Sequence, residues 1–188
     1  MNIKKAVAGI SSLAMLASSV PVLNNQGISA KAENSEYNYA EALQKSMFFY
    51  EAQQAGELPD WNSVSWRADS MLKEDGTSSD VVPGGWFDAG DHLKFSLTNA
   101  YTASVLSWGL MQYGDAVKKA GLYDTYLKNL KWGLDFVQAC DLGDSVIGTI
   151  GDDAFDHVWY GSPEVYMRKY NLKQGTEDRP YDTITCVT

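Results

Sequence analysis

Apolar residues recur at helical spacing in three segments of the chain. The first segment has apolar positions three and four residues apart, at Ala40, Leu43, Met47 and Tyr50. Asn38 and Glu41 frame the start of this segment as a capping box, and Gly56 is a residue at which the helix can end. This pattern predicts a helix that begins after Asn38.

The second and third segments predict longer helices. The second runs from about Leu97 to Val117, and its two adjacent stripes give it an apolar face wide enough for a mostly buried helix. These two stripes are Leu97, Tyr101, Val105 and Trp108, and Leu106, Leu110, Tyr113 and Val117. The third segment has one stripe, which consists of Tyr123, Leu127, Leu130, Leu134, Val137 and Cys140. All three segments carry ordinary core patterns and predict no chemistry.

The sequence has two long polar connections. One, at about 57–94, lies between the first and second helices, and the other follows the third helix from 141 onward. Loops of this length are uncommon in compact domains and are usually functional. Val146 to Ile150 is the one stretch that favours a short strand. Three helices supply little core for so many aromatic and acidic residues, so the chain is expected to be part of a longer protein.

The first 32 residues are typical of a secretory signal peptide. Lys4 and Lys5 form a basic start, a largely apolar stretch follows, and residues 30–32 (AKA) offer a cleavage site. A membrane-spanning helix is the weaker alternative, because serines and Pro21 interrupt the apolar stretch. Residues 33–188 would then form the mature part, and the protein is expected to be secreted and extracellular, without a membrane partner.

Charge excludes some partners. The whole chain has a formal net charge of −9, with 24 acidic and 15 basic residues, and loss of Lys4, Lys5 and Lys31 would leave 12 basic residues and a charge of −12. No basic patch remains to bind phosphates, so nucleic acid is not an expected partner. Cys140 and Cys186 make no disulfide framework, although a bridge between them is possible, and no zinc-ligand spacing appears.

The candidate chemistry lies in residues 84–95 (GGWFDAGDHLKF), where Asp88 and Asp91 are three positions apart. Spacing alone leaves three uses open. The pair can be part of a turn, because Asp and Gly are common turn residues. It can contribute to a calcium site, although only two carboxylates are close. It can also activate water for hydrolysis, with the abundant aromatic residues stacking on sugar rings.

Several motifs of the chain, in the same order as in the family, resemble those of glycoside hydrolase family 9, the cellulase family that includes the endoglucanases. Residues 84–95 are similar to the family's Asp-Ala-Gly-Asp signature. The other similar stretches are 58–60 (LPD), 65–70 (SWRADS), 106–108 (LSW), 156–161 (DHVWYG), 163–164 (PE) and 179–180 (RP). The resemblance implies an all-α fold, a partial six-hairpin α/α barrel (an α/α toroid) truncated on its C-terminal side. It also implies hydrolysis of β-1,4-glucosidic bonds in cellulose or a related β-glucan, with inversion and without a required cofactor.

The resemblance also implies roles for single residues. Asp91 corresponds to the general base, and Asp88 to the residue that orients the same water. His157 would hydrogen-bond the glucan near the cleavage point, and Tyr160 would stack where the family commonly has tryptophan. The segment around Arg67 is interpreted as scaffold that holds this loop.

The general acid of the family is a glutamate that would lie beyond residue 188, since neither Glu164 nor Glu177 occupies the matching position. A non-catalytic glycan-binding or structural fragment therefore remains the alternative. Structural calcium and an attached binding module or dockerin stay open.

Overall fold

The computed structural model describes residues 37–174 and 177–185, and it is mostly helical with one small sheet. Its elements in chain order are α1 (Tyr39–Ala52), β1 (Lys94–Phe95), α2 (Ser96–Lys119), α3 (Tyr123–Ala139), β2 (Ser145–Ile150), α4 (Asp153–Asp156), α5 (Pro163–Gln174) and β3 (Tyr181–Thr185). The expected signal peptide at 1–32, and Cys186 with its possible bridge to Cys140, lie outside the described residues. No helix in the described part is both long and apolar enough to cross a membrane.

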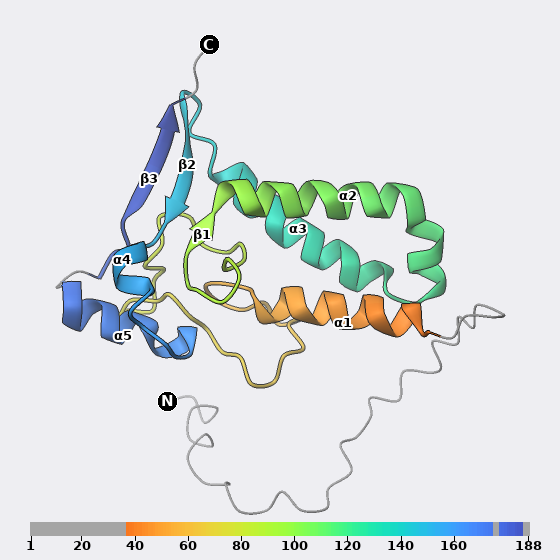
Figure 1. Cartoon of the computed structure of the whole chain (residues 1–188), viewed down its shortest axis with the longest axis horizontal. Coiled ribbons are helices and arrows are strands. Elements are labelled where there is room, and N and C mark those ends of the chain that lie inside the picture. The colour runs from red at the N-terminus through yellow and green to blue at the C-terminus, as the bar shows by residue number, and fades with distance from the viewer. Residues whose placement is uncertain (1–36, 175–176, 186–188) are drawn as a thin grey trace, which may run out of the picture.

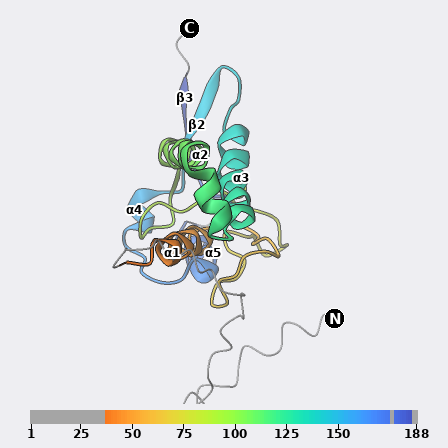
Figure 2. The same cartoon turned by 90° about the vertical axis from the view of Figure 1, so that its right-hand side faces the viewer.

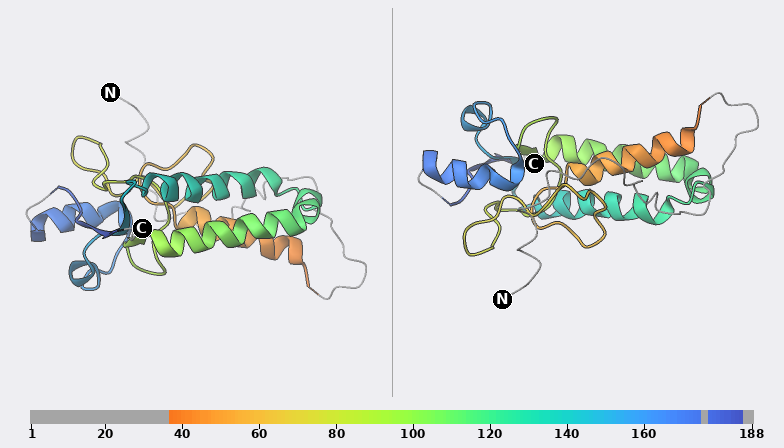
Figure 3. Two further views of the ribbon diagram at one scale, coloured as in Figure 1. Left: turned by 90° about the horizontal axis from the view of Figure 1, so that it is seen from above. Right: turned by 90° about the horizontal axis from the view of Figure 1, so that it is seen from below.

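Helices α1, α2 and α3 lie together on one side of the molecule, and the sheet, α4 and α5 lie on the other (Figure 1). Figure 2 views the molecule from the side of the three helices. Helices α2 and α3 run side by side, and α1 packs against α3 (Figure 3). The predicted start of α1 is confirmed, because the Asn38 side chain accepts a hydrogen bond from the Glu41 N–H at 3.1 Å. The helix ends at Ala52, and Gly56, four residues later, adopts a left-handed conformation with φ 93°.

The expectation that α2 is mostly buried is wrong for the described structure. Its inner stripe packs on α1 and α3 through Leu106 and Val117, both less than 10% exposed. Its other stripe faces outward, with Leu97 78%, Tyr101 71% and Trp108 66% exposed. The physical reason is that α1 and α3 cover only one side of α2, so an apolar face wide enough for two neighbours meets solvent on its second half.

The buried face of α3 is also offset from its predicted stripe. Tyr126, Gly133 and Phe136 lie on the buried face, whereas Leu127 and Leu134 lie at its exposed margin. Gly133 is required there because a Cβ would meet the ring of Trp86 at 2.3 Å. The close approach of this indole, which the apolar pattern does not reveal, decides which side of α3 is inside.

The sheet is antiparallel with the strand order β1-β2-β3. The predicted strand at 146–150 is confirmed as β2, and β3 was not predicted. Lys94 in β1 pairs with Ile150 in β2, which places the end of the Asp88–Asp91 loop against the centre of the sheet. Strand β1 continues directly into α2, so the sheet fixes both the loop and the start of the longest helix.

Three charged side chains are buried together behind this loop. The carboxylate of Asp80 lies 2.9 Å from Lys94 Nζ and 3.1 Å from Arg179 Nε, and all three residues are almost fully buried. Lys94 also donates to the carbonyls of Val82 and Gly84. Burial lowers the pKa of Lys94, and the negative charge of Asp80 opposes that effect. One carboxylate thus serves as the shared counter-charge of two cations from distant parts of the chain.

Replacement of Asp80 should be severe, because Asp80→Asn leaves Lys94 and Arg179 buried without a counter-charge. Breaking a buried pair by removing one partner costs about 3–5 kcal/mol, and we expect a loss of that order in the free energy of unfolding, measured by urea denaturation. Asp135→Asn is the matched control, because Asp135 pairs with Lys131 on the surface. That change should cost less than about 1 kcal/mol. Equal losses for both variants would contradict this assignment.

The outward stripe of α2 should bind the apolar dye ANS. The double variant Leu97→Gln and Trp108→Gln should lower the dye fluorescence while changing stability by no more than about 0.5 kcal/mol per site, since both side chains are mostly exposed. Leu106→Ala on the opposite stripe should instead cost about 2–5 kcal/mol. Dye binding that the double variant leaves unchanged would show that this stripe is covered.

Candidate active site

Residues 88–93 form a closed loop that carries the two predicted aspartates. The Asp88 N–H donates to the Leu93 carbonyl at 2.9 Å, and the Asp91 N–H donates to the Asp88 carbonyl at 3.0 Å. The Asp91 carboxylate accepts from the Leu93 N–H at 2.9 Å, which orients the side chain. Between the aspartates, Ala89 adopts the left-handed conformation with φ 45°. Such a conformation costs roughly 1–3 kcal/mol outside glycine and is typical of functional sites.

The structure brings Asp91 and His157 together. His157 follows α4, and its Nε2 lies 3.8 Å from Asp91 Oδ2. Asp91 is half-buried and His157 is largely exposed, so the pair lies at the surface of the molecule. The 156–161 segment and the Asp88–Asp91 loop therefore meet in space although they are far apart in the sequence.

A third group in this site is Asp156, which the sequence motif contains but to which no role was assigned. Atoms of Asp91, Asp156 and His157 all lie within 4.8 Å of one another. Asp156 is 2% exposed, and its carboxylate accepts from the His92 backbone N–H at 3.1 Å. His92 Nδ1 lies 3.2 Å from the same carboxylate. The signal available beforehand was the position of Asp156 next to His157 and of His92 next to Asp91.

The surroundings of Asp91 raise the pKa of its carboxyl group. Burial is the largest cause, and the negative charges of Asp156 and Asp88 act in the same direction. The hydrogen bond from the Leu93 N–H and the nearby His157 oppose the shift. A carboxylate with a raised pKa is a stronger base than an ordinary aspartate, as a group that removes a proton from water requires.

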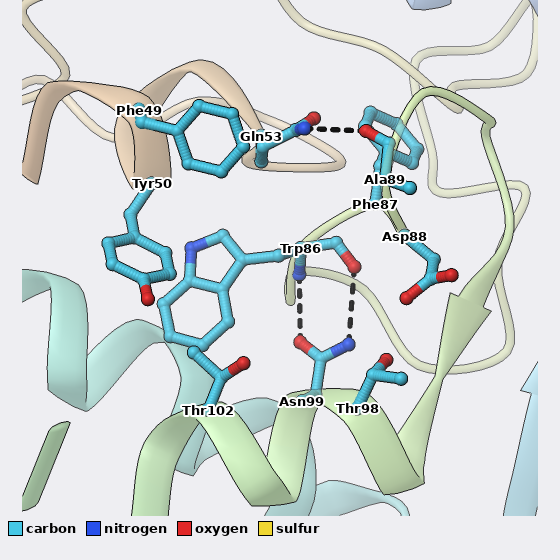
Figure 4. A pocket seen from close by; sticks show the side chains of 10 residues that line it. All are labelled: Phe49, Tyr50, Gln53, Trp86, Phe87, Asp88, Ala89, Thr98, Asn99 and Thr102. Carbon is cyan, nitrogen blue, oxygen red and sulfur yellow. Dashed lines mark hydrogen bonds between the residues drawn. The ribbon is translucent and has the colours of Figure 1, made fainter. Parts of the chain in front are cut away.

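Asp88 lines a pocket of about 240 Å³ between the loop and the helices (Figure 4). Phe49 and Tyr50 of α1 and Thr98 and Thr102 of α2 also line it. Gln53 donates to the Ala89 carbonyl at 2.7 Å and so holds the strained residue from the α1 side. Asp88 is close enough for its charge to act on Asp91, but it does not belong to the tight group around His157.

The Tyr160 side chain, which belongs to the same 156–161 segment, is fully exposed. Its ring is therefore accessible to a sugar that could stack on it. The neighbouring Trp159 is half-buried and packs on the cluster that contains Phe155 and Tyr166. The two consecutive aromatic residues thus differ, with one in the core and one at the surface.

Arg67 supports the Asp88–Asp91 loop, as the scaffold interpretation of its segment requires. Its guanidinium is buried, lies 2.6 Å from Glu164 Oε1 and donates to the carbonyls of Ala52 and Gln54. It also lies over the ring of Phe87 at 5.9 Å. Arg67 therefore connects the end of α1, the start of α5 and the residue that precedes Asp88.

The Asp91 group is a poor match for calcium. It offers two carboxylates and one imidazole, whereas calcium takes six to eight oxygen ligands. Of the three uses of Asp88 and Asp91 that spacing left open, the calcium site is therefore the one that this geometry supports least.

The model for Glycosyl hydrolase family 9 matches residues 39–186. The chain belongs to this family. Endoglucanase A of Bacillus pumilus is 44% identical over 141 residues, which are 74% of this chain and 21% of that protein. Endoglucanase 7 of Oryza sativa subsp. japonica is 41% identical, over 79% of this chain and 28% of its own length. The matched part of the chain thus spans between 21% and 28% of the length of these two curated relatives.

Solved family 9 structures have the same fold in this region. Endoglucanase CelQ from Clostridium thermocellum, complexed with cellotriose, superimposes with a TM-score of 0.68 at 49% identity, over 79% of this chain and 22% of CelQ. The endoglucanase of the termite Nasutitermes takasagoensis gives a TM-score of 0.66 at 35% identity, over 80% of this chain and 33% of its own. The expected fold class, part of a six-hairpin α/α barrel, is confirmed, with the three-stranded sheet as an addition.

In this family 9 chain, the free energy of unfolding should be lower when Asp91 is ionised than when it is protonated. Because its folded pKa is raised above the usual 3.8, the folded state binds more protons than the unfolded state between these two values. Stability contributed by this group is therefore lost as the pH rises through that window. Asp91→Asn should make the chain more stable than the parent at about pH 7, and the difference should vanish near pH 3, as measured by urea unfolding.

Asp75→Asn is the control of opposite sign. Hydrogen bonds from the Thr77 hydroxyl and N–H lower the pKa of Asp75, so its replacement should destabilise the chain at neutral pH or leave it unchanged. If Asp91→Asn lowers stability at pH 7, the electrostatic description of the loop is incorrect.

Proposed function

We propose that this chain is part of a secreted endoglucanase that hydrolyses β-1,4-glucosidic bonds of cellulose or a related β-glucan with inversion. The observation that carries the proposal is the half-buried Asp91 carboxylate, which lies beside Asp156 and His157 on a strained loop. Family membership and relatives named endoglucanases support it, as does the complex of CelQ with cellotriose.

In the proposed mechanism, Asp91 is the general base. It accepts a proton from a water molecule while the water oxygen attacks the anomeric carbon and the glycosidic bond breaks. Asp88 helps to orient this water, which explains why two carboxylates are kept close in spite of their repulsion. His157 hydrogen-bonds the sugar next to the attacked carbon, and Tyr160 stacks on a neighbouring ring.

The departing oxygen needs a proton from a general acid. Inverting enzymes place the two carboxyl groups roughly 6.5–9.5 Å apart, so that a water fits between base and substrate. Asp156 is too close to Asp91 for this role and is buried. We therefore assign the acid to a glutamate outside residues 1–188. The alternative, a non-catalytic glycan-binding fragment, uses the same groove without the proton transfer.

Export belongs to the same proposal. The basic start, apolar stretch and cleavage pattern of residues 1–32 support a signal peptide. The acidic balance of the remaining residues suits an uncharged polymer substrate and gives no reason to expect a nucleic-acid partner.

A chimera tests the proposal. Residues 37–188 would replace the matching segment of CelQ, and release of soluble sugar from cellulose would be measured. We expect the chimera to be active and Asp91→Asn to lower kcat by about 10²–10⁴-fold, since an amide cannot accept the proton. Binding of cello-oligosaccharides should change much less, because stacking on aromatic rings supplies most of it.

Two comparisons make this test sharp. Asp153→Asn removes one negative charge from the exposed side of α4 and should leave kcat unchanged. The chain alone should bind cello-oligosaccharides without useful hydrolysis, because it lacks the assigned acid. Near-normal turnover by the Asp91→Asn chimera, or robust hydrolysis by the chain alone, would refute the mechanism. Binding without turnover in a folded chimera would favour the glycan-binding alternative.

A further inference from the structure

Asp156 is a buried carboxylate without a lysine or arginine partner among the described residues. Its ion-pair contact is with His92, at 3.2 Å from Nδ1, and its side chain is about 1% exposed. An ionised carboxylate at such a position is expensive unless something compensates for the lost hydration. The His92 backbone N–H and ring supply hydrogen bonds, but they leave a negative charge facing Asp91 and His157.

The His92 ring, which Asp156 contacts, is itself packed between two aromatic side chains. The His92 ring stacks on Tyr166 with ring centres 4.9 Å apart and an interplanar angle of 24°, and it meets Phe87 edge-on at 5.6 Å. His92 directly follows Asp91, and Phe87 directly precedes Asp88. The contact between Asp156 and His92 therefore holds the loop at the residue next to the proposed base.

We propose that Asp156 is a positioning residue for Asp91: it fixes the loop through His92 and keeps a negative charge beside the Asp91 carboxylate. This inference rests on the proposed function, in which Asp91 is the base. Asp156 itself touches neither the water nor the sugar in this assignment. Its own backbone also connects it to His157, so one residue sets the relative position of two groups in the site.

The charge effect has a definite sign. Among the described residues, the titratable or charged groups around this pair are Asp88 and His92 of the loop, Asp152 and His157 at the two ends of α4, Tyr166 of α5, and Arg179, which donates to the His92 carbonyl. Asp88 and Asp156 both raise the pKa of Asp91, and His157 lowers it. Removal of the Asp156 charge should therefore make Asp91 a weaker base that titrates at lower pH.

Carboxyl-carbon NMR titration of the full chain tests this without any activity measurement. In Asp156→Asn, the Asp91 resonance should titrate at lower pH than in the parent. Asp153→Asn removes the same charge from the same short helix, on its exposed side, and should leave the Asp91 midpoint in place. Asp156→Glu retains the charge and should bring the midpoint back toward that of the parent. An unchanged Asp91 midpoint in a folded Asp156→Asn chain would overturn the proposal.

The unchanged chain provides a second measurement if Asp156→Asn fails to fold. Because the Asp156 carboxylate lies within 4.8 Å of the Asp91 group, its carboxyl-carbon resonance should shift while Asp91 takes up its proton. An Asp156 resonance that does not move through the Asp91 transition would overturn the proposal as well.

The CelQ chimera then separates this inference from the proposed function. With Asp156→Asn, the acidic limb of its kcat/KM profile should move to lower pH, and kcat should fall by roughly 10-fold or more while KM changes little, because a misplaced group can cost up to about 10²-fold. If the chimera without further substitution is inactive, but Asp156→Asn shifts the Asp91 midpoint in the chain alone, the proposed function is refuted and the role of Asp156 stands. An unmoved acidic limb in an active chimera would refute the role of Asp156 alone.

Discussion

The buried contact of Asp80 with Lys94 and Arg179 is the interaction on which the arrangement of this chain depends. Asp80 lies in the long connection after α1, Lys94 in β1, and Arg179 just before β3. Arg179 also donates to the carbonyls of Ile150 and His92. Because buried charges need counter-charges where they lie, this contact ties the sheet, the long connection and the Asp88–Asp91 loop together. The polar cluster acts beside two buried apolar clusters in this half of the molecule, one around Phe155 and Tyr166 and one around Phe136 and Ile150.

The site on this scaffold concentrates unfavourable features in a few residues. Ala89 is strained, Asp156 is buried without a basic partner among the described residues, and Asp91 is crowded by two other carboxylates. Each feature reduces stability, and each is compensated nearby: Gln53 donates to the Ala89 carbonyl, the His92 N–H to Asp156, and the Leu93 N–H to Asp91. A functional site is expected to lower the stability of the fold where its chemistry requires a group in an unfavourable state. This combination distinguishes the loop from an ordinary aspartate-glycine turn.

Sequence patterns predicted the local elements well and the long-range contacts poorly. The cap at Asn38, the three helices and the strand at β2 follow from local spacing, which acts over a few residues. The exposed stripe of α2 agrees with the expected truncation of the barrel, which leaves apolar faces without partners, whereas the width of the apolar face alone predicted burial. The contact of Asp80 with Arg179 spans 99 positions (80 to 179), and no periodicity encodes it. The motifs did bring Asp91 and His157 into one hypothesis, yet they left Asp156 without a role.

Helix α2 and the Asp88–Asp91 loop differ in how completely the rest of the chain covers them. Helix α2 presents a large apolar stripe to solvent, whereas the loop that carries Asp91 is closed by its own hydrogen bonds and by contacts with His92, Gln53 and the Asp80 cluster. The position of Asp91 is therefore set by residues between α1 and β3 and does not depend on what covers α2. The Asp91 carboxyl group can therefore be studied by titration in this chain alone. The hydrolysis that we propose needs, in addition, a proton donor several ångströms away, so its test requires groups beyond those that hold Asp91.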